Sequence, residues 1–278
     1  MELTREDVER VVAAALAEDV GTGDATTLAL VPEDARCRAE LLLEEPGVVC
    51  GVAVAGVVFR ALDPAVQVEA KLDEGAAVSG VPAVIAELEG PARAILSGER
   101  VALNLLGRLC GIASLTRPFV ELTEGTSTTV LDTRKTTPGL RALEKYAVRC
   151  GGGRSHRAGL YDGVLVKENH LRVAGGVAAA LAALDGRVDG LPVEVEAETI
   201  AQVREALAGG APRILLDNMS PEEVREAVEL AAGRVELEAS GGVSLATVRA
   251  YAETGVDFVS VGALTHSARS LHVSLEVL

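Results

Sequence analysis

Six short runs of strand-forming residues recur through the second half of the chain, and helical patterns separate them. The runs lie at 128–132, 163–166, 193–195, 214–216, 235–237 and 258–261. Strands that alternate with crossover helices form a parallel sheet, because a tight turn cannot join parallel neighbours. A sheet of this kind rolls into an α/β barrel, but about 150 residues are too few for an eight-stranded barrel of roughly 250. We therefore predict an incomplete α/β barrel of six or seven strands.

The first third of the chain has a mixed pattern of helices and strands. Thr4 and Asp7 resemble a capping box that begins a helix, and a polar loop follows at 21–27. A second helix is expected over 51–62. Strands are expected at 37–43, 66–71 and 83–88.

A long helical pattern over 97–121 separates the two regions, with breaks expected near Gly111 and Pro118. We place the domain boundary on this helix. The N-terminal domain is expected over 1–112, joined by the C-terminal segment 268–278, and the barrel is expected over 113–267.

Composition excludes several classes of protein. The N-terminus carries charges of both signs without an apolar block, which predicts a cytoplasmic protein, and the longest apolar run, 47–59, is too short to span a membrane. A net charge of -15 disfavours nucleic acid and anionic membranes as partners. Neither zinc-site nor disulfide spacing is found among the four cysteines, Cys37, Cys50, Cys110 and Cys150.

One segment reverses this acidic balance. Residues 134–167 contain eight basic and two acidic side chains, and they include three of the four lysines of the chain. A concentrated positive region on an acidic protein favours binding of a small polyanion. A solvated helix face accounts for the central cations of the segment but not for those at strand ends, Arg134, Lys135 and Lys167.

Polar residues follow the predicted strands where each one ends. They are Arg134 and Lys135, Lys167, Glu196, Asp217, Ser240 with Gly241 and Gly242, and Gly262. Because the carboxyl ends of barrel strands meet at one mouth, we expect these residues to converge on an active site.

The residue types at this mouth suggest a phosphorylated sugar. Glycines permit close approach to a phosphate, which favours phosphate binding at ASGGV, residues 239–243, over a plain turn. Glu194 and Glu196 share one face of their strand. Glu196 and Asp217 are then candidates for Mg²⁺ or ribose binding, with structural ion pairs as the alternative.

Three further residues have functional and structural interpretations. His156 and Arg157 follow a glycine run, where recognition of carboxylate or phosphate is favoured over a packing role. Lys167 could alternatively form a Schiff base. Arg100 lies in the first turn of the helix expected from residue 97, where the helix dipole disfavours a cation; either Glu99 compensates or a bound anion does.

These stretches resemble the quinolinate phosphoribosyltransferase family over nearly the whole chain. The resemblance rests on EDVGTGDATT, GERVALNLLGRLCGIAS, VEVE, LLDNM, LEASGGV, VSVGALTHS and, most specifically, TRKTTPG followed by SHR and VKENH. It implies transfer of phosphoribosyl from phosphoribosyl pyrophosphate to quinolinate, with loss of pyrophosphate and carbon dioxide. It also implies an α/β open sandwich domain before the barrel, dependence on Mg²⁺, and a homodimer with shared active sites that could assemble further.

The resemblance also implies roles for individual residues. The quinolinate and pyrophosphate pocket would contain Arg134, Lys135, His156, Arg157 and Lys167, with Arg100 from the partner subunit. Glu196 and Asp217 would hold ribose and Mg²⁺, and Lys135 and Lys167 would join them as catalytic residues. The 5-phosphate would be bound by Ser240, Gly241, Gly262 and His266.

Three alternatives remain at this stage. A relative with the same fold could use another acceptor, as do the pyrophosphorylase-like proteins associated with molybdenum transport. A Schiff-base aldolase would use Lys167. A non-catalytic dimer would bind phosphoribosyl pyrophosphate without consuming it.

Overall fold

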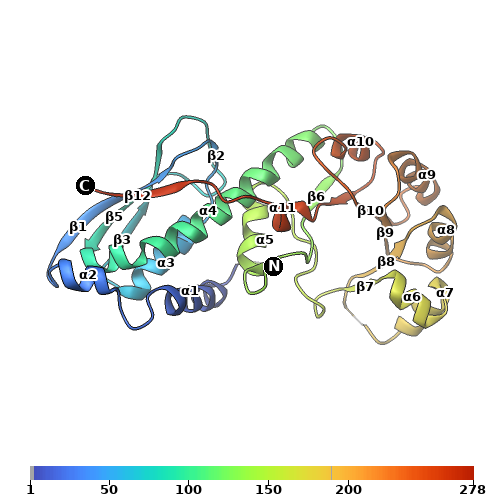
Figure 1. The fold of residues 1–278 in the computed structure, drawn as a ribbon. Coiled ribbons are helices and arrows are strands. Elements are labelled where there is room, and N and C mark those ends of the chain that lie inside the picture. The colour runs from blue at the N-terminus through green and yellow to red at the C-terminus, as the bar shows by residue number, and fades with distance from the viewer. Residues whose placement is uncertain (1–2, 189) are drawn as a thin grey trace. The chain divides into compact units, whose positions relative to one another are not determined.

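The computed structural model describes residues 3–188 and 190–278 and divides them into two compact units. The first unit comprises the residues up to Arg117 together with 136–152 and 264–278. The second unit comprises 118–135 and 153–263. Figure 1 labels the helices and strands of both.

The first unit contains a four-stranded antiparallel sheet. Its strands lie in the order β12 (Val273–Val277), β1 (Arg36–Leu43), β5 (Ala83–Pro91) and β3 (Gln67–Ala70). A separate short pair is formed by β2 (Gly47–Val48) and β4 (Ala77–Val78). Three of the four main strands match those expected at 37–43, 66–71 and 83–88, and β1 shows the reason: Ala39, Leu41 and Leu43 alternate along it and are fully buried.

The helices of this unit begin where the sequence offers capping groups. In α1 (Arg5–Asp19) the Thr4 side chain accepts from the Asp7 backbone N–H at 3.1 Å, as predicted. The helix α2 (Ala25–Leu30) was not predicted, because Asp24, which caps it, lies in the expected polar loop. Two further helices are α3 (Val52–Leu62), which packs on α1 and β3, and α5 (Arg141–Cys150).

Helix α4 (Ala92–Thr123) is continuous, so the predicted breaks at Gly111 and Pro118 were wrong. Gly111 serves packing instead. A β-carbon there would lie 1.9 Å from the carbonyl oxygen of Arg269, and one at Gly107 would lie 2.7 Å from that of Leu271. The glycines therefore allow the backbone at 269–271 to lie against the helix, where the Leu271 N–H donates to the Gly107 carbonyl at 2.9 Å.

The observed division of the chain differs in detail from the expected domains. The expected boundary after residue 112 falls inside α4, and α5 belongs to the first unit although it was placed in the barrel. A buried ion pair accounts for this: Arg108 on α4 contacts the fully buried Glu144 on α5 at 2.7 Å. The middle of the basic segment thus contributes to the core of the first unit.

The second unit is a six-stranded parallel sheet with helices on its outer side (Figure 1). The strand order is β6 (Thr129–Leu131), β11 (Phe258–Ser260), β10 (Glu236–Ser240), β9 (Arg213–Asp217), β8 (Val193–Ala197) and β7 (Val164–Val166). The predicted incomplete α/β barrel is confirmed, with β6 and β7 as its edges. The short helix α11 (Ala263–His266) follows β11.

The outer helices begin in different ways, some with a side-chain cap and some without one. They are α6 (Glu168–Ala174), α7 (Val177–Leu184), α8 (Ile200–Ala208), α9 (Pro221–Ala231) and α10 (Val248–Ala252). In α9 the Ser220 side chain caps the helix and Glu223 completes the capping box, as expected. Over the described parts of the chain, we find no helix with the length and apolar character needed to cross a bilayer.

The close approach of α4 to residues 269–271 predicts that Gly111→Ala destabilises the protein. The added methyl group would displace the Arg269 backbone, and overpacking of this kind costs about 1–3 kcal/mol in free energy of unfolding. Urea denaturation followed by circular dichroism measures the change. Gly80→Ala is the matched control, because a β-carbon at Gly80 meets nothing within 4 Å. Equal stability of the two variants would contradict the packing role.

Candidate active site

A cavity of about 540 Å³ lies at the carboxyl ends of the parallel strands. Nine of the twelve predicted site residues line it: Arg134, Lys135, His156, Arg157, Lys167, Glu196, Asp217, Ser240 and Gly241. The lining also contains Gly242, which was expected at this mouth, and residues that were not predicted, namely Thr133, Leu165, Leu215, Asn218, Glu238 and Ser260. The expected convergence of strand ends on one site is therefore present in the second unit.

These side chains are positioned by the strands, because each lies at or just after the carboxyl end of one. Asp217 and Ser240 are the last residues of β9 and β10, and the two are direct partners in the register of the sheet. Lys167 follows β7 immediately and lies at the cap of α6. Each polar group thus emerges where a buried apolar strand stops.

Glu196 is held between a cation and a helix start. Its Oε1 accepts the backbone N–H of Glu168, the first residue of α6, at 2.9 Å, and its Oε2 lies 3.7 Å from the Nζ of Lys167. The Glu196 side chain is almost buried, whereas that of Lys167 is 55% exposed. The carboxylate is consequently fixed, while the ammonium can follow a ligand.

The turn after β10 requires glycine. Gly241 has φ +94°, and a β-carbon there would lie 2.2 Å from the side-chain oxygen of Asn218. The backbone N–H of Asn218 donates to the Ser240 carbonyl at 2.8 Å, and its side-chain amide donates to Asp217 at 2.7 Å. The turn therefore brings bare backbone close to Asp217.

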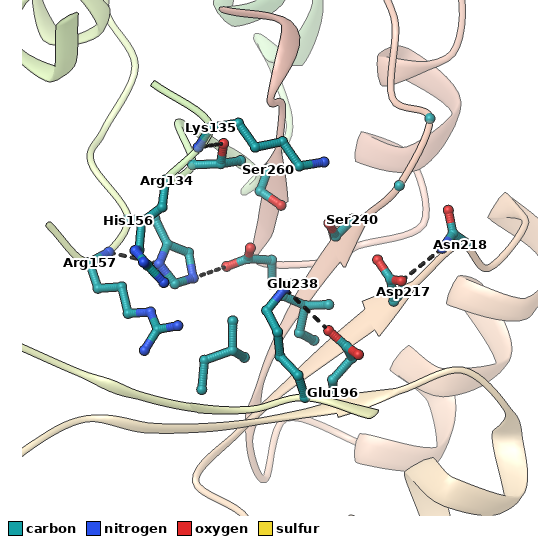
Figure 2. A pocket seen from close by; sticks show the side chains of 16 residues that line it. Arg134, Lys135, His156, Arg157, Glu196, Asp217, Asn218, Glu238, Ser240 and Ser260 are labelled. Carbon is teal, nitrogen blue, oxygen red and sulfur yellow. Dashed lines mark hydrogen bonds and ion pairs between the residues drawn. The ribbon is translucent and has the colours of Figure 1, made fainter. Parts of the chain in front are cut away.

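Four cations line the cavity: Arg134, Lys135, Arg157 and Lys167. Figure 2 labels the first three of them. Burial, and next the nearby Arg134, lower the pKa of the Arg157 guanidinium. Arg157 also donates from Nη1 to the Gly163 carbonyl at 2.8 Å. A bound anion reduces the repulsion between like charges held in one cavity. The cavity is therefore suited to a substrate with several negative charges.

Carboxylates in and beside the cavity fit a divalent cation. One oxygen from each of Glu196, Glu198 and Asp217 can be chosen so that all lie within 4.8 Å of one another. Oxygen ligands of this type are those that Mg²⁺ prefers, usually with one or two protein carboxylates and the remainder from water and phosphate. Glu198 was not predicted, although it continues the alternation of Glu194 and Glu196.

Sequence reasoning did not find a cluster of charged side chains that includes His156 and Glu238 of the cavity lining. Nε2 of His156 lies 3.0 Å from Glu194 Oε2 and 3.5 Å from Glu238 Oε2, and Figure 2 shows His156 and Glu238 pointing toward one another. Arg213 contacts both carboxylates from β9. The same two-residue alternation from Ser240 would have placed Glu238 on the inner face of β10.

Burial is the main cause that raises the pKa of Glu238 to about 7, and the negative charge of Glu194 adds to it. His156 and Arg213 act in the opposite sense. A carboxyl group that is fully buried beside a second carboxylate retains its proton more strongly than an exposed one.

Three predicted residues are not part of the cavity lining. Gly262 follows β11 in the second unit, whereas Arg100 and His266 belong to the first unit. The helix argument for Arg100 was wrong, because α4 begins at Ala92 and Arg100 therefore lies well beyond its first turn. Glu99 approaches Arg100 only to 3.9 Å, and the Arg100 side chain is 63% exposed.

Comparison with known proteins gives consistent matches over both units. The family model described as quinolinate phosphoribosyl transferase, C-terminal domain, matches residues 112–276, and that of the N-terminal domain matches residues 24–110.

Named relatives match nearly the full chain. A Bacillus subtilis (strain 168) protein named probable nicotinate-nucleotide pyrophosphorylase (carboxylating) is 46% identical over 262 residues, which cover 94% of this chain and 90% of that protein. Quinolinate phosphoribosyltransferase (decarboxylating) 1b of Nicotiana tabacum is 40% identical, with 98% and 82% covered. The solved nicotinate-nucleotide pyrophosphorylase from Francisella tularensis has a TM-score of 0.94 at 40% identity, with 100% and 98% covered.

The raised pKa of Glu238 predicts a pH-dependent contribution to stability. The unfolded chain loses this proton near pH 4.5 and the folded protein near pH 7, so the stabilising contribution falls as pH rises between these values. Glu238→Gln abolishes the titration. The free energy of unfolding of this variant relative to the unsubstituted protein should therefore rise by up to about 3 kcal/mol from pH 4.5 to 8.

Urea denaturation at pH 4.5 and pH 8 measures this difference. Glu236→Gln is the control, because Glu236 is exposed on the same strand. The explanation fails if both variants show the same dependence on pH.

Proposed function

This chain belongs to the quinolinate phosphoribosyltransferase family, and from that premise we propose that it transfers phosphoribosyl from phosphoribosyl pyrophosphate to the ring nitrogen of quinolinate. Pyrophosphate and carbon dioxide leave, and nicotinate mononucleotide is the product. The observation that carries the proposal is the presence of four cations, the Glu196 and Asp217 carboxylates and a glycine turn in one cavity.

The proposed quinolinate site uses Arg134, Arg157 and Lys167. Quinolinate brings two adjacent carboxylates, and guanidinium groups bind carboxylates through paired hydrogen bonds. Because Arg157 is partly desolvated beside Arg134, each gains more from a bound dianion than a fully solvated arginine would. The apolar side chains of Leu165 and Leu215 offer packing for the flat ring.

The proposed phosphoribosyl pyrophosphate site lies toward β9 and β10. Ser240 and the bare backbone of Gly241 would bind the 5-phosphate, with Gly262 and His266 as further proposed contacts. Glu196 and Asp217 would bind the ribose hydroxyls. When Mg²⁺ is bound by Glu196 and Asp217, it would supply positive charge to the pyrophosphate and so make it a better leaving group.

At the ribose, the chain stabilises separated charges. Positive charge develops on the sugar as its bond to the pyrophosphate oxygen breaks, as in glycoside cleavage. The ring nitrogen supplies the electron pair of the new bond. Lys135 and Lys167 would neutralise the charge of the departing pyrophosphate, while the Glu196 and Asp217 carboxylates would stabilise the positive charge that develops on the sugar.

Decarboxylation then follows from the same arrangement. The substituted ring nitrogen carries a positive charge, so the ring accepts the electron pair released when the adjacent carbon–carboxylate bond breaks. Carbon dioxide leaves, and the ring carbon takes a proton from water. The cations need only orient the carboxylate, and no general base is required.

The test is an assay of the purified protein with quinolinate, phosphoribosyl pyrophosphate and Mg²⁺. We expect nicotinate mononucleotide and carbon dioxide in equal amounts, and no product when nicotinate replaces quinolinate or when a chelator removes the metal. Binding of phosphoribosyl pyrophosphate without turnover of quinolinate would indicate that another acceptor is used.

Loss of either central cation should abolish this activity. Arg134→Ala and Lys167→Ala should each lower kcat/KM at least about 100-fold, which is typical for loss of one charged group that stabilises the transition state. Circular dichroism establishes that the fold is retained. Near-normal turnover in either variant would contradict the assigned roles.

We also propose a homodimer in which Arg100 acts in the site of the partner subunit. Its exposed side chain and weak local pairing support an intermolecular role. Arg100→Ala and Lys167→Ala subunits should each be inactive alone. Because a mixed dimer would contain one complete site, co-expression of the two should restore about a quarter of the normal activity. Failure of mixed dimers, purified with two different tags, to show activity would exclude sharing.

A further inference from the structure

The ring of His156 is fixed through both of its nitrogens by other parts of the chain. The backbone N–H of Arg157 lies 2.7 Å from Nδ1, and a backbone N–H can only donate. Nδ1 is therefore the unprotonated acceptor, and Nε2 carries the proton that it donates to Glu194 at 3.0 Å. The His156 backbone N–H in turn donates to the buried Asp132 at 2.9 Å.

These contacts connect His156 to a substrate-facing cation. The hydrogen bond at Nδ1 fixes the main chain of Arg157, whose side chain lines the cavity. The same short segment is stabilised by Asp162, which accepts the backbone N–H groups of Ala158 and Gly159 at 2.7 and 2.8 Å. A shift of the His156 ring would therefore move Arg157.

Arg213 contacts both of the carboxylates that lie near His156, Glu194 and Glu238. Its Nε lies 3.1 Å from Glu194 Oε1, an ion pair without hydrogen-bond geometry, and its Nη2 donates to Glu238 Oε2. The guanidinium stacks on the ring of Phe258, with 4.0 Å from Cζ to the ring centroid. One planar cation on β9 thus holds two buried carboxylates on the strands at either side of it, β8 and β10, which a single ammonium group cannot reproduce.

We propose that Arg213 is a positioning residue for substrate recognition: by holding Glu194 and Glu238, it orients His156 and, through His156, Arg157. This inference rests on the proposed function for its kinetic consequence. Arg213 itself lies outside the lining of the cavity.

The first test is Arg213→Lys, with Arg204→Lys as the control. Arg204 is exposed on α8 and approaches Glu226 only to 3.7 Å. We expect Arg213→Lys to raise the KM for quinolinate about tenfold or more, as for a displaced bidentate carboxylate contact, with kcat and the KM for phosphoribosyl pyrophosphate within about threefold. An unchanged KM for quinolinate, or equal losses for both substrates, would overturn the proposal.

A second variant covers the case in which Arg213→Lys does not fold. The triple variant Arg213→Met, Glu194→Gln, Glu238→Gln removes all three charges together, so that no buried charge is left unpaired. It should fold and still show the raised KM for quinolinate. A normal KM in this variant would equally overturn the proposal.

A spectroscopic test separates this inference from the proposed function. The chain has four histidines, so imidazole ¹⁵N signals can be assigned to His156 through His156→Gln. His156 should show a protonated Nε2 and an unprotonated Nδ1 in the unsubstituted protein, and a mixture of tautomers in Arg213→Lys. If the protein does not turn over quinolinate, the proposed function fails, and the spectra alone decide: a mixture only in the variant supports the positioning role, and identical spectra overturn it.

Discussion

Parallel pairing of six strands determines where every polar group of the site can lie. Within such a sheet most side chains are apolar, because each strand is covered on both faces, and a charged group inside a strand, such as Glu194 or Glu238, needs a buried partner. Asp217 and Ser240 share one level of the register, and Lys167 and Glu196 emerge beside them. The chemistry of the site is therefore a consequence of where burial stops.

Charged side chains form two groups in the second unit, one that lines the cavity and one around Arg213. Four cations line the cavity, and the lowered pKa of Arg157 reflects its burial and, next, the nearby Arg134. Deeper in the unit, Arg213 compensates Glu194 and Glu238 so that buried carboxylates do not stay unpaired. The four cations line the cavity, whereas Arg213 lies outside its lining, and this difference separates binding of a substrate from support of the site.

The sequence predicted those elements and site residues that depend on local patterns, but not those that depend on contacts between residues distant in sequence. The alternation of strands and helices predicted the incomplete barrel, and nine of the site residues lie in its cavity. Gly111 was misjudged because its partner, the Arg269 backbone, is distant in sequence. The placement of α5 depends on Arg108 and Glu144, and the role of Arg213 depends on two other strands, so neither could be seen from neighbouring residues.

The alternation along β8 has a consequence for how this family can change. Glu194 and Glu196 are two residues apart on one strand. Glu194 contacts His156 and Arg213, and Glu196 lines the cavity. A one-residue shift of β8 in the register of the sheet would turn both carboxylates to the opposite face at once. A substitution can therefore change one of these positions alone, whereas a change in the length of the strand affects both. We expect β8 to tolerate substitutions far better than insertions or deletions.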